Sequence, residues 1–196
     1  MKRLFDIVGS LFGLVVLSPL FVFLSLWVGL SSKGGVFYKQ RRVGLNGVDF
    51  TIYKFRSMTV GSDKQGLLTV GGRDCRITKA GYFIRKYKLD ELPQLFNVLK
   101  GDMSFVGPRP EVRKYVDMYS KEQRRVLSVR PGITDIASMK YRNENEILAK
   151  AENPEQYYIE VIMPDKIAIN LEYIDTRTFF RDIRLIFRTI AGKSEE

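Results

Sequence analysis

The most restrictive feature of the sequence is an apolar segment that follows a short basic N-terminus. It runs from Leu4 to Leu30, about 27 residues, and contains a single ionisable side chain, Asp6. A helix that spans a bilayer needs roughly 20 apolar residues, so this segment is long enough to enter a membrane. It exceeds the apolar part of a signal peptide, and no small-residue cleavage site follows it. We therefore expect a membrane-associated N-terminal helix.

Ser18 and Pro19 lie near the middle of this apolar segment. Proline removes one backbone hydrogen bond and clashes with the preceding turn, so we expect the helix to break there. Basic residues flank both ends of the segment: Lys2 and Arg3 before it, and Lys33, Lys39, Arg41 and Arg42 after it. Lys and Arg favour the cytoplasmic side of a membrane. The flanks therefore favour a re-entrant helix that bends and leaves on the side it entered, with a single-pass helix as the alternative.

The remaining sequence predicts an α+β fold that is mainly helical and has one short β-hairpin. Residues 36–38 and 49–55 have the composition of strands, 44–47 that of a turn, and 61–74 that of a mobile loop. Apolar spacing predicts helices over 80–88, 91–99, 111–128 and 144–152. Asp90 is the expected N-cap of the helix over 91–99, with Pro93 in its first turn and Gly101 at its end. The length suits a single domain, residues 1–196, with the membrane helix in residues 1–30.

Residues 178–190 predict a basic amphipathic helix at the C-terminus. Its aromatic and aliphatic side chains fall on one side and its arginines elsewhere: Phe179, Phe180, Ile183, Ile186, Phe187 and Ile190 against Arg181, Arg184 and Arg188. Such a helix can lie in the headgroup region of a membrane. The alternative is a helix that packs its apolar face on the protein core. The membrane segment at the N-terminus favours the interfacial interpretation.

Composition excludes several kinds of active site. The 196 residues include no histidine and one cysteine, Cys75. A Ser-His-Asp triad, a Cys-His pair and a His-ligated zinc site are therefore ruled out. The formal charge of +10 favours polyanionic partners such as nucleic acid, anionic lipid or phosphorylated substrates. Any acid, base or nucleophile must come from Asp, Glu, Lys, Tyr or Ser.

Asp90 and Glu91 are the candidate catalytic residues. Adjacent carboxylates at a helix start are commonly capping residues, so the pair alone is a weak signal. Several cationic segments, however, could converge on it to hold phosphates: Lys54 and Arg56, Arg85, Arg109, and Arg130. A carboxylate among such cations can attack phosphorus when Mg²⁺ neutralises the phosphate charge. Other arginines are assigned to solvated surface or lipid headgroups: Arg41, Arg42, Arg124 and Arg125.

Taken in order, these motifs resemble the bacterial sugar transferase family, in the small monotopic form of its phosphoglycosyl transferases. The resemblance covers nearly the whole chain. It rests on the apolar helix with Ser18-Pro19, Lys54-Phe55-Arg56-Ser57-Met58, Leu89-Asp90-Glu91-Leu92-Pro93-Gln94, Gly101-Asp102-Met103-Ser104, Gly107-Pro108-Arg109-Pro110 and Arg130-Pro131-Gly132-Ile133-Thr134. After Thr134 the chain departs from many relatives with Asp135-Ile136-Ala137-Ser138-Met139, so the sugar that it recognises stays open. By position alone, residues 135–165 are candidates for shaping the sugar pocket.

The resemblance implies a reaction, its components and a location. Asp90, near a Mg²⁺ ion, would take a phosphosugar from a UDP-sugar with loss of UMP and then pass it to undecaprenyl phosphate. Glu91 would assist the second step, and Lys54, Arg56, Arg85 and Arg109 are our candidates for phosphate contacts. The catalytic region, residues 31–196, would lie on the cytoplasmic face of the bacterial inner membrane, where the product starts a lipid-linked glycan such as a lipopolysaccharide. The glycan pathway and the oligomeric state stay open.

Two other functions remain as alternatives. A membrane-tethered binding module could use the positive charge on nucleic acid or anionic lipid without catalysis, although the sequence contains no recognised base-reading module, and we expect no nucleic-acid partner. A single-step transferase could use Glu91 as a base without a covalent intermediate. Trapping a phosphosugar on Asp90 would separate the covalent mechanism from the single-step one.

Overall fold

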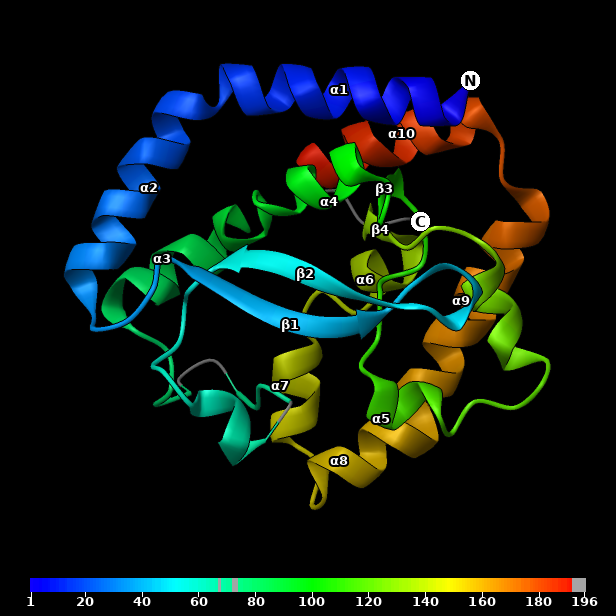
Figure 1. Ribbon diagram of the computed structural model, residues 1–196. Coiled ribbons are helices and arrows are strands. Elements are labelled where there is room, and N and C mark those ends of the chain that lie inside the picture. The colour runs from blue at the N-terminus through cyan, green and yellow to red at the C-terminus, as the bar shows by residue number, and fades with distance from the viewer. Residues whose placement is uncertain (67, 72–73, 192–196) are drawn as a thin grey trace.

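The computed structural model describes residues 1–66, 68–71 and 74–191, and it is mainly helical with a central β-hairpin (Figure 1). In chain order the elements are α1 (Lys2–Val16), α2 (Ser18–Ser31), β1 (Phe37–Val43), η1 (Leu45–Gly47), β2 (Asp49–Phe55), η2 (Ser62–Gln65), α3 (Lys79–Lys86), η3 (Leu89–Glu91), α4 (Gln94–Lys100), β3 (Ser104–Val106), α5 (Arg113–Val116), η4 (Gln123–Ser128), β4 (Gly132–Thr134), α6 (Ile136–Lys140), α7 (Glu144–Ala149), α8 (Pro154–Tyr157), the π-turn η5 (Tyr158–Ile162), α9 (Met163–Thr176) and α10 (Phe179–Ile190). This composition confirms the predicted α+β class.

The apolar N-terminal segment forms two helices, α1 and α2, that arch over one side of the molecule (Figure 1). They meet at a 63° bend next to Ser18-Pro19, as predicted. The Ser18 hydroxyl donates to the carbonyl of Val15 at 2.8 Å, which satisfies a backbone group at the break. Within the described residues no single helix has the length and apolar character to cross a membrane, whereas this bent pair passes the same test as a unit.

The start of the helix pair is fastened to the rest of the protein. At the start of α1, Arg3 donates to the carbonyls of Val98 and Leu99 at 2.6 and 2.8 Å, at the C-terminal end of α4. The buried Asp6 carboxylate accepts from the hydroxyl of Ser104 and the amide of Phe105, both at 3.1 Å. Asp6, the one ionisable residue inside the apolar segment, therefore binds β3 and orients this face of α1 toward that strand.

The predicted hairpin is present, and its first strand is longer than expected. β1 and β2 pair antiparallel from Phe37↔Phe55 to Val43↔Asp49. The turn at 44–47 contains a short 3-10 turn with Asn46 at φ 55°, the left-handed region that Asn tolerates. Residues 39–43, which are rich in charge and were not predicted as strand, extend β1 because each pairs with a residue of β2.

A second pair of strands, not predicted, lies beside α4. β3 and β4 are parallel and contain three residues each, with Ser104 opposite Gly132 and Val106 opposite Thr134. The backbones approach so closely that a Cβ on Gly132 would lie 2.2 Å from the amide nitrogen of Gly107. This packing fixes the loop that follows β3, which carries Arg109.

Two of the predicted helices need correction. The helix over 91–99 begins at Gln94 with Pro93 as its N-cap, so Asp90 is not a cap. It ends as predicted, with Gly101 left-handed at φ 97°. The single helix expected over 111–128 is two short ones, α5 and η4, because Ser120 and Gln123 hydrogen-bond to each other's backbone amides and start a new turn.

The other predicted helices are present with shifted bounds. The helix over 80–88 is α3, and that over 144–152 is α7, which ends at Ala149. The predicted loop over 61–74 contains the short turn η2, and its residues 67, 72 and 73 lie outside the described residues.

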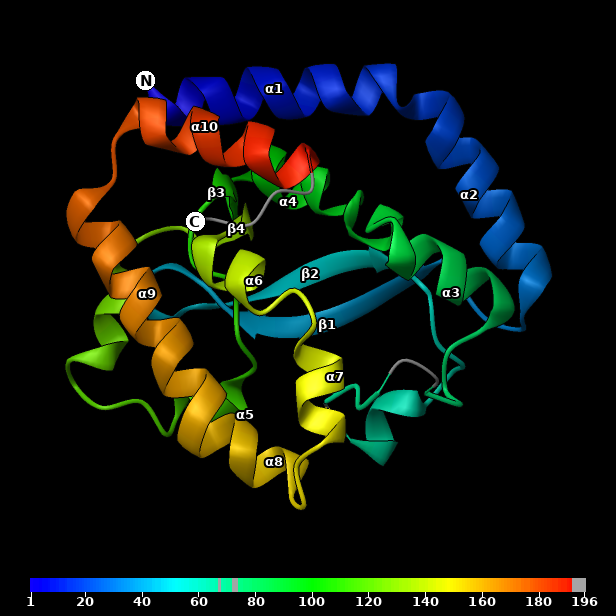
Figure 2. The ribbon, with the colours of Figure 1, turned by 180° about the vertical axis from the view of Figure 1, so that it is seen from behind.

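The predicted C-terminal amphipathic helix is α10, which lies beneath α1 (Figures 1 and 2). Asp182 and Leu185 are buried, and Asp182 accepts from Lys2 of α1 at 2.5 Å. Phe180 and Phe187 are largely exposed. The helix thus packs one face on the core, as the alternative interpretation held, and presents two phenylalanines outward.

Candidate active site

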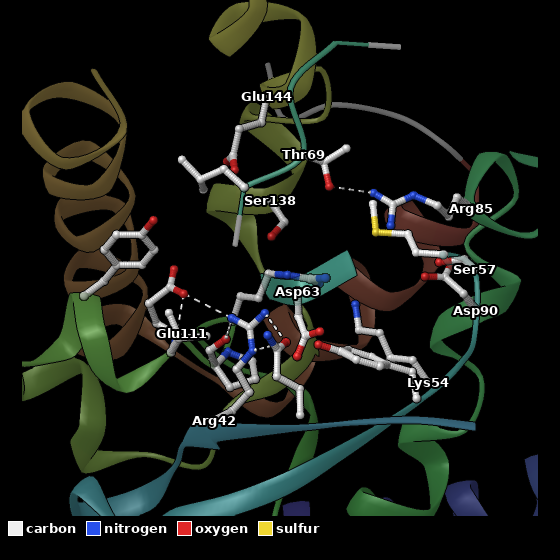
Figure 3. A pocket seen from close by; sticks show the side chains of 18 of the residues that line it. Arg42, Lys54, Ser57, Asp63, Thr69, Arg85, Asp90, Glu111, Ser138 and Glu144 are labelled. Atoms are coloured by element: carbon white, nitrogen blue, oxygen red, sulfur yellow. Dashed lines mark hydrogen bonds and ion pairs between the residues drawn. The ribbon is translucent and has the colours of Figure 1, made fainter. Parts of the chain in front are cut away.

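A cavity of about 600 Å³ opens between the hairpin and the helices α3, α6, α7 and α9. In Figure 3, Asp90 and Arg85 lie on one side of it, Arg42 and Glu111 on the opposite side, and Ser138 and Glu144 above. Four of the candidate phosphate-binding residues contribute to its lining: Lys54, Arg56, Arg85 and Arg109. The fold therefore brings these segments to one cavity although they are spread over more than fifty residues of sequence.

Asp90 and Glu91 reach this cavity region through a short 3-10 turn, η3, between α3 and α4. Lys88 turns the chain after α3 by adopting the left-handed region at φ 56°. Leu89 and Leu92, on either side of the acidic pair, pack against a core cluster built from α2, β2 and α3. Because these two leucines hold the turn from behind, the acidic side chains are kept on the side of the cations.

Glu91 is held in ion pairs with two cations. Its Oε1 accepts from Lys54 Nζ at 2.8 Å and from Arg109, whose second guanidinium nitrogen lies 3.4 Å from Oε2. Burial would raise the pKa of Glu91, but attraction from Arg109 and Lys54 outweighs it and holds this pKa well below the usual range. Glu91 is therefore an ionised carboxylate whose acceptor sites are occupied by cations.

Asp90 differs from its neighbour in lacking such a partner. Among the described residues, no side chain or backbone group forms a hydrogen bond or ion pair with its carboxylate, which is buried and lines the cavity. Burial raises the pKa of Asp90, with Lys54 opposing the shift. Burial also lowers the pKa of Lys54, an effect that Glu91 counteracts. The site thus contains one neutralised carboxylate and one carboxylate available to a ligand.

The register between β2 and α4 keeps Lys54 opposite Glu91. The fully buried Asn97 of α4 donates to the carbonyl of Thr51 at 2.7 Å and accepts from the amide of Tyr53 at 3.1 Å. A buried amide that satisfies two strand backbone groups fixes the position of the strand along the helix. This role of Asn97 was not predicted.

Arg85 and Arg56 are placed differently from Lys54 and Arg109. Arg85 lines the cavity, donates to the Thr69 hydroxyl at 3.1 Å, and lowers the pKa of Asp90 by its charge, against the larger effect of burial. The buried guanidinium of Arg56 donates to the carbonyls of Ser32 and Lys33, each at 2.7 Å. These contacts direct Arg56 at the end of α2, so the structure does not bring its charged group to the acidic pair.

A second polar cluster on the far side of the cavity was missed. Arg42 had been assigned to surface or lipid headgroups, and that was wrong: its Nη1 donates to Glu111 Oε1 at 3.0 Å inside the cavity lining. The Tyr158 hydroxyl donates to the other oxygen of Glu111. Alternation along β1 would have identified Arg42, had the strand been predicted to its full length, because residues i and i+2 share a face.

Residues between 135 and 165 also line the cavity, and that they shape a sugar pocket stays a prediction. They come from the start of α6, from α7 and from the chain leading into α9: Asp135, Ala137, Ser138, Glu144, Asn145, Tyr158 and Met163. Lys166 of α9 extends this wall and forms an ion pair with Glu144.

The oxygen ligands at this site suit a cation such as Mg²⁺ that is held mainly by the phosphate oxygens of a bound substrate. No group of three His, Cys, Asp or Glu side chains that could hold a metal occurs in the described part of the chain. Asp90 supplies one carboxylate without a partner, beside cations that can bind phosphate. Mg²⁺ typically uses one or two protein carboxylates together with phosphate oxygens. The residues present therefore fit a Mg²⁺-phosphate complex better than a resident metal cage.

Comparison with known protein families identifies the family of this chain. The family model described as bacterial sugar transferase matches residues 1–194. The chain belongs to the bacterial sugar transferase family. This membership confirms the resemblance that the motifs indicated.

The similar proteins differ in length. The chain is 39% identical over 190 residues to the sugar transferase EpsL of Bacillus subtilis, covering 97% of this chain and 85% of that one. It is 38% identical to the UDP-N-acetylgalactosamine-undecaprenyl-phosphate N-acetylgalactosaminephosphotransferase of Aeromonas hydrophila, over 96% of this chain but 42% of the relative. The UDP-glucose:undecaprenyl-phosphate glucose-1-phosphate transferase of Escherichia coli is 36% identical, over 97% of this chain and 39% of the relative. The match thus spans about two fifths of the length of these two larger transferases.

Proposed function

We propose that this protein transfers a sugar 1-phosphate from a UDP-sugar to undecaprenyl phosphate and releases UMP, through a covalent phosphosugar on Asp90. The names of the transferases from Aeromonas hydrophila and Escherichia coli support the reaction. The observation that carries the covalent step is the contrast between the two carboxylates. Asp90 lines the cavity without a partner in the described structure, whereas Glu91 is held by Lys54 and Arg109.

In the first step, a carboxylate oxygen of Asp90 attacks the phosphorus that bears the sugar. The bond between this phosphorus and the bridging oxygen breaks, and the bridging oxygen leaves with UMP. In the second step, a phosphate oxygen of undecaprenyl phosphate attacks the same phosphorus and frees the Asp90 carboxylate. The single-step alternative needs Glu91 as a base, but its low pKa and its two cationic partners make it a poor proton acceptor at neutral pH.

The cations around the dyad would orient and neutralise the diphosphate. Arg109 and Lys54 form ion pairs with Glu91, and we propose that they also contact the diphosphate of the substrate. Arg85 would join them, since it lies on the same side of the cavity as Asp90 (Figure 3). We propose Asp90 as the protein ligand of a Mg²⁺ ion, which would supply charge neutralisation at the transferred phosphate.

We also propose that the molecule lies on the cytoplasmic face of the bacterial inner membrane and starts a lipid-linked glycan there. The fastening of both ends of the α1–α2 pair to one body supports a re-entrant helix, because a straight crossing would place these ends on opposite sides of the bilayer. Exposed apolar side chains on α1 and α10 would contact lipid: Leu4, Val8, Leu11, Phe12, Val15, Phe180 and Phe187.

The test is UMP release by purified protein in nanodiscs with Mg²⁺, undecaprenyl phosphate and a panel of UDP-sugars. We expect Mg²⁺-dependent UMP from at least one donor and none from the Asp90→Asn variant. With radiolabelled sugar and no acceptor, label should stay on the wild-type chain and not on Asp90→Asn. Wild-type turnover by a folded Asp90→Asn variant would overturn the covalent mechanism. Salt-sensitive nucleic-acid binding without UMP release would favour a binding module instead.

A further inference from the structure

An ion pair with no role in the proposed transfer lines the cavity on the side opposite Asp90. Arg42 Nη1 donates to Glu111 Oε1 at 3.0 Å, and Figure 3 shows both side chains across the cavity from Asp90. Both remain accessible, with 21% and 20% of their side-chain surface exposed. A charged pair that lines an open cavity and keeps this much exposed surface is within reach of a ligand.

The position of Glu111 is fixed by its backbone and by three hydrogen-bond donors. Its carbonyl accepts from the amide of Val43 at 2.9 Å, which holds it at the end of β1. Oε1 accepts from Arg42 and from the amide of Val112 at 2.7 Å, and Oε2 accepts from the hydroxyl of Tyr158. A carboxylate offers about four acceptor positions, so the contacts made by the described residues leave one position free on Oε2.

Strand β1 connects the acidic pair to this ion pair along the cavity. Alternate residues of a strand share a face, and three alternate residues of β1 line the cavity: Tyr38, Gln40 and Arg42. Tyr38 lies opposite Lys54, the partner of Glu91, so the row begins beside the acidic pair. The four residues from Tyr38 to Arg42 span roughly 13 Å. The nucleoside diphosphate part of a UDP-sugar has a comparable length when extended, so one donor molecule can reach both ends.

The geometry of the proposed reaction directs the nucleotide along this strand. In phosphoryl transfer the attacking and leaving oxygens lie roughly in line, on opposite sides of the phosphorus, and the other three oxygens lie around it. Asp90 supplies the attacking oxygen and UMP carries the leaving one, so UMP extends away from Asp90. The hexose is bonded through one of the other three oxygens and projects sideways. The side of the cavity opposite Asp90, with Arg42 and Glu111, therefore faces the nucleoside (Figure 3).

The chemistry of Glu111 suits a ribose. Ribose hydroxyls are hydrogen-bond donors, and a carboxylate accepts from them in dinucleotide-binding folds. An ionised phosphate has no proton to donate, and a carboxylate repels it. Arg109, two residues before Glu111, binds Glu91 of the acidic pair instead. One short segment thus presents a cation toward the phosphates and a carboxylate toward the ribose.

We propose that the ribose of the UDP-sugar binds at the end of the cavity opposite Asp90, where Glu111 Oε2 accepts a hydrogen bond from a ribose hydroxyl. This end of the cavity then distinguishes a ribonucleotide from an analogue without these hydroxyls. The assignment rests on the proposed function in taking the ligand to be a uridine nucleotide.

The experiment measures binding of UDP, which has the nucleoside and both phosphates but no hexose, to the full-length protein in nanodiscs with Mg²⁺. Its dissociation constant is compared with those of inorganic diphosphate and of a UDP analogue whose ribose lacks both hydroxyls. Glu111→Gln is the central variant. Arg42 and the amide of Val112 bind its one remaining oxygen, which leaves an N–H₂ group in place of Oε2. Glu144→Gln is the matched comparison, since Glu144 lines another wall of the cavity, pairs with Lys166 and is 22% exposed.

We expect wild type to bind UDP about tenfold more tightly than the analogue. Glu111→Gln should weaken UDP about tenfold, the effect of losing one hydrogen bond to a charged acceptor, and leave the analogue and diphosphate unchanged. Glu144→Gln should change none of the three. Equal weakening of all three ligands by Glu111→Gln would make Glu111 a structural residue only and overturn the proposal, as would no change in any. Weakening of UDP by Glu144→Gln alone would place the nucleoside on the other wall and also overturn it.

Wild-type protein that binds UDP no more tightly than the analogue overturns the proposal as well. The UMP-release assay tests the transfer reaction separately. UMP release by wild type, together with unchanged UDP binding in Glu111→Gln, would reject this ribose site and leave the proposed function standing.

Discussion

Asp90 and Glu91 are adjacent in one 3-10 turn, yet their surroundings shift their pKa values in opposite directions. Burial raises the pKa of Asp90, whereas Arg109 and Lys54 outweigh burial at Glu91 and lower its pKa. Neighbouring titratable groups with divergent pKa values are a common sign of divided roles in an active site. Glu91 neutralises and holds its two cations, whereas the unpaired, buried carboxylate of Asp90 destabilises the folded protein. Replacing Glu91 should therefore lower stability, and replacing Asp90 should raise it.

Replacing Glu91 by Gln should destabilise the protein by about 3 kcal/mol, because Lys54 and Arg109 lose the buried anion that neutralises them. Thermal unfolding in detergent measures the loss. Glu155→Gln is the matched control, since Glu155 pairs with Lys114 at an exposed site and should cost less than about 1 kcal/mol. Equal losses in the two variants would contradict the structural role of Glu91.

Replacing Asp90 by Asn should raise the melting temperature at pH 7. A carboxyl whose folded pKa is raised binds its proton more tightly in the folded state, so its favourable contribution is lost as pH rises through that pKa. At pH 7, above the usual pKa of Asp, burial of the Asp90 carboxyl therefore opposes folding, and Asn removes this cost. The difference between wild type and variant should shrink as pH falls toward the usual Asp pKa. A variant that melts below wild type at pH 7 would contradict this account.

At the scale of single residues, the sequence identified the residue types of the site but not the direction in which every side chain points. The acidic pair and Arg109 could be predicted because their residue types and motif order are distinctive. Lys54 and Arg56 are two residues apart, and alternation would put them on one face of a strand. However, β2 ends at Phe55, and Arg56 turns toward α2 instead. Arg42 was missed because charge alone does not distinguish a surface arginine from one that faces Glu111.

At the scale of elements, Arg56 connects the end of α2 to the hairpin. Its guanidinium bonds the carbonyls of Ser32 and Lys33 after α2, where backbone acceptors have no helical partner. Replacement by Lys cannot reproduce the paired geometry and should cost about 2 kcal/mol. We expect a lower melting temperature with little change in the KM for the UDP-sugar. Arg41→Lys, on the exposed side of β1, is the control and should be neutral.

The sequence-based prediction that Arg56 binds phosphate gives the opposite pattern. It requires a higher KM for the UDP-sugar in Arg56→Lys, with the melting temperature close to that of wild type. Measuring both quantities on the same preparation therefore separates a helix-capping role from a phosphate-binding one.

Local signals predicted the elements that are defined by local contacts. The hairpin and the break at Ser18-Pro19 follow from turn chemistry and from proline, and both are present. The parallel pair β3–β4 was not predicted, because each strand has three residues and the pairing joins segments more than twenty residues apart. Its signal lies in Gly107 and Gly132, which permit a backbone approach that no side chain would allow. Such a constraint becomes visible only when both segments are placed.

At the scale of the whole molecule, the apolar surface and the cavity are held in a fixed relation. Lys2, Arg3 and Asp6 fasten α1 to α4, β3 and α10, and Arg56 fastens the end of α2. The turn with Asp90 and Glu91 lies between α3 and α4, which pack against α2 and α1 respectively. A lipid surface that binds α1 would thus be positioned relative to Asp90 by rigid contacts rather than by a linker. This arrangement suits a reaction between a soluble donor and a lipid acceptor.

Accessibility to a water-soluble maleimide tests how the molecule sits on a bilayer. In a Cys75→Ser background, single cysteines would replace Phe12 of α1, Phe180 of α10 and Val48 in the hairpin turn, three side chains that are 69%, 82% and 67% exposed in the protein itself. In detergent-free nanodiscs we expect the cysteines at positions 12 and 180 to react far more slowly than the one at 48, because acyl chains and headgroups cover them.

Rapid labelling at position 180 with protection at position 12 would mean that α10 contacts only the protein core and that α1–α2 alone holds the membrane. In intact cells, a cysteine inserted after Met1 that reacts with an impermeant maleimide would place the N-terminus outside. That result would contradict the re-entrant geometry, because Lys2 and Arg3 are bonded to the same body that carries Asp90. Protection of that cysteine until the cells are lysed is the outcome that this bonding requires.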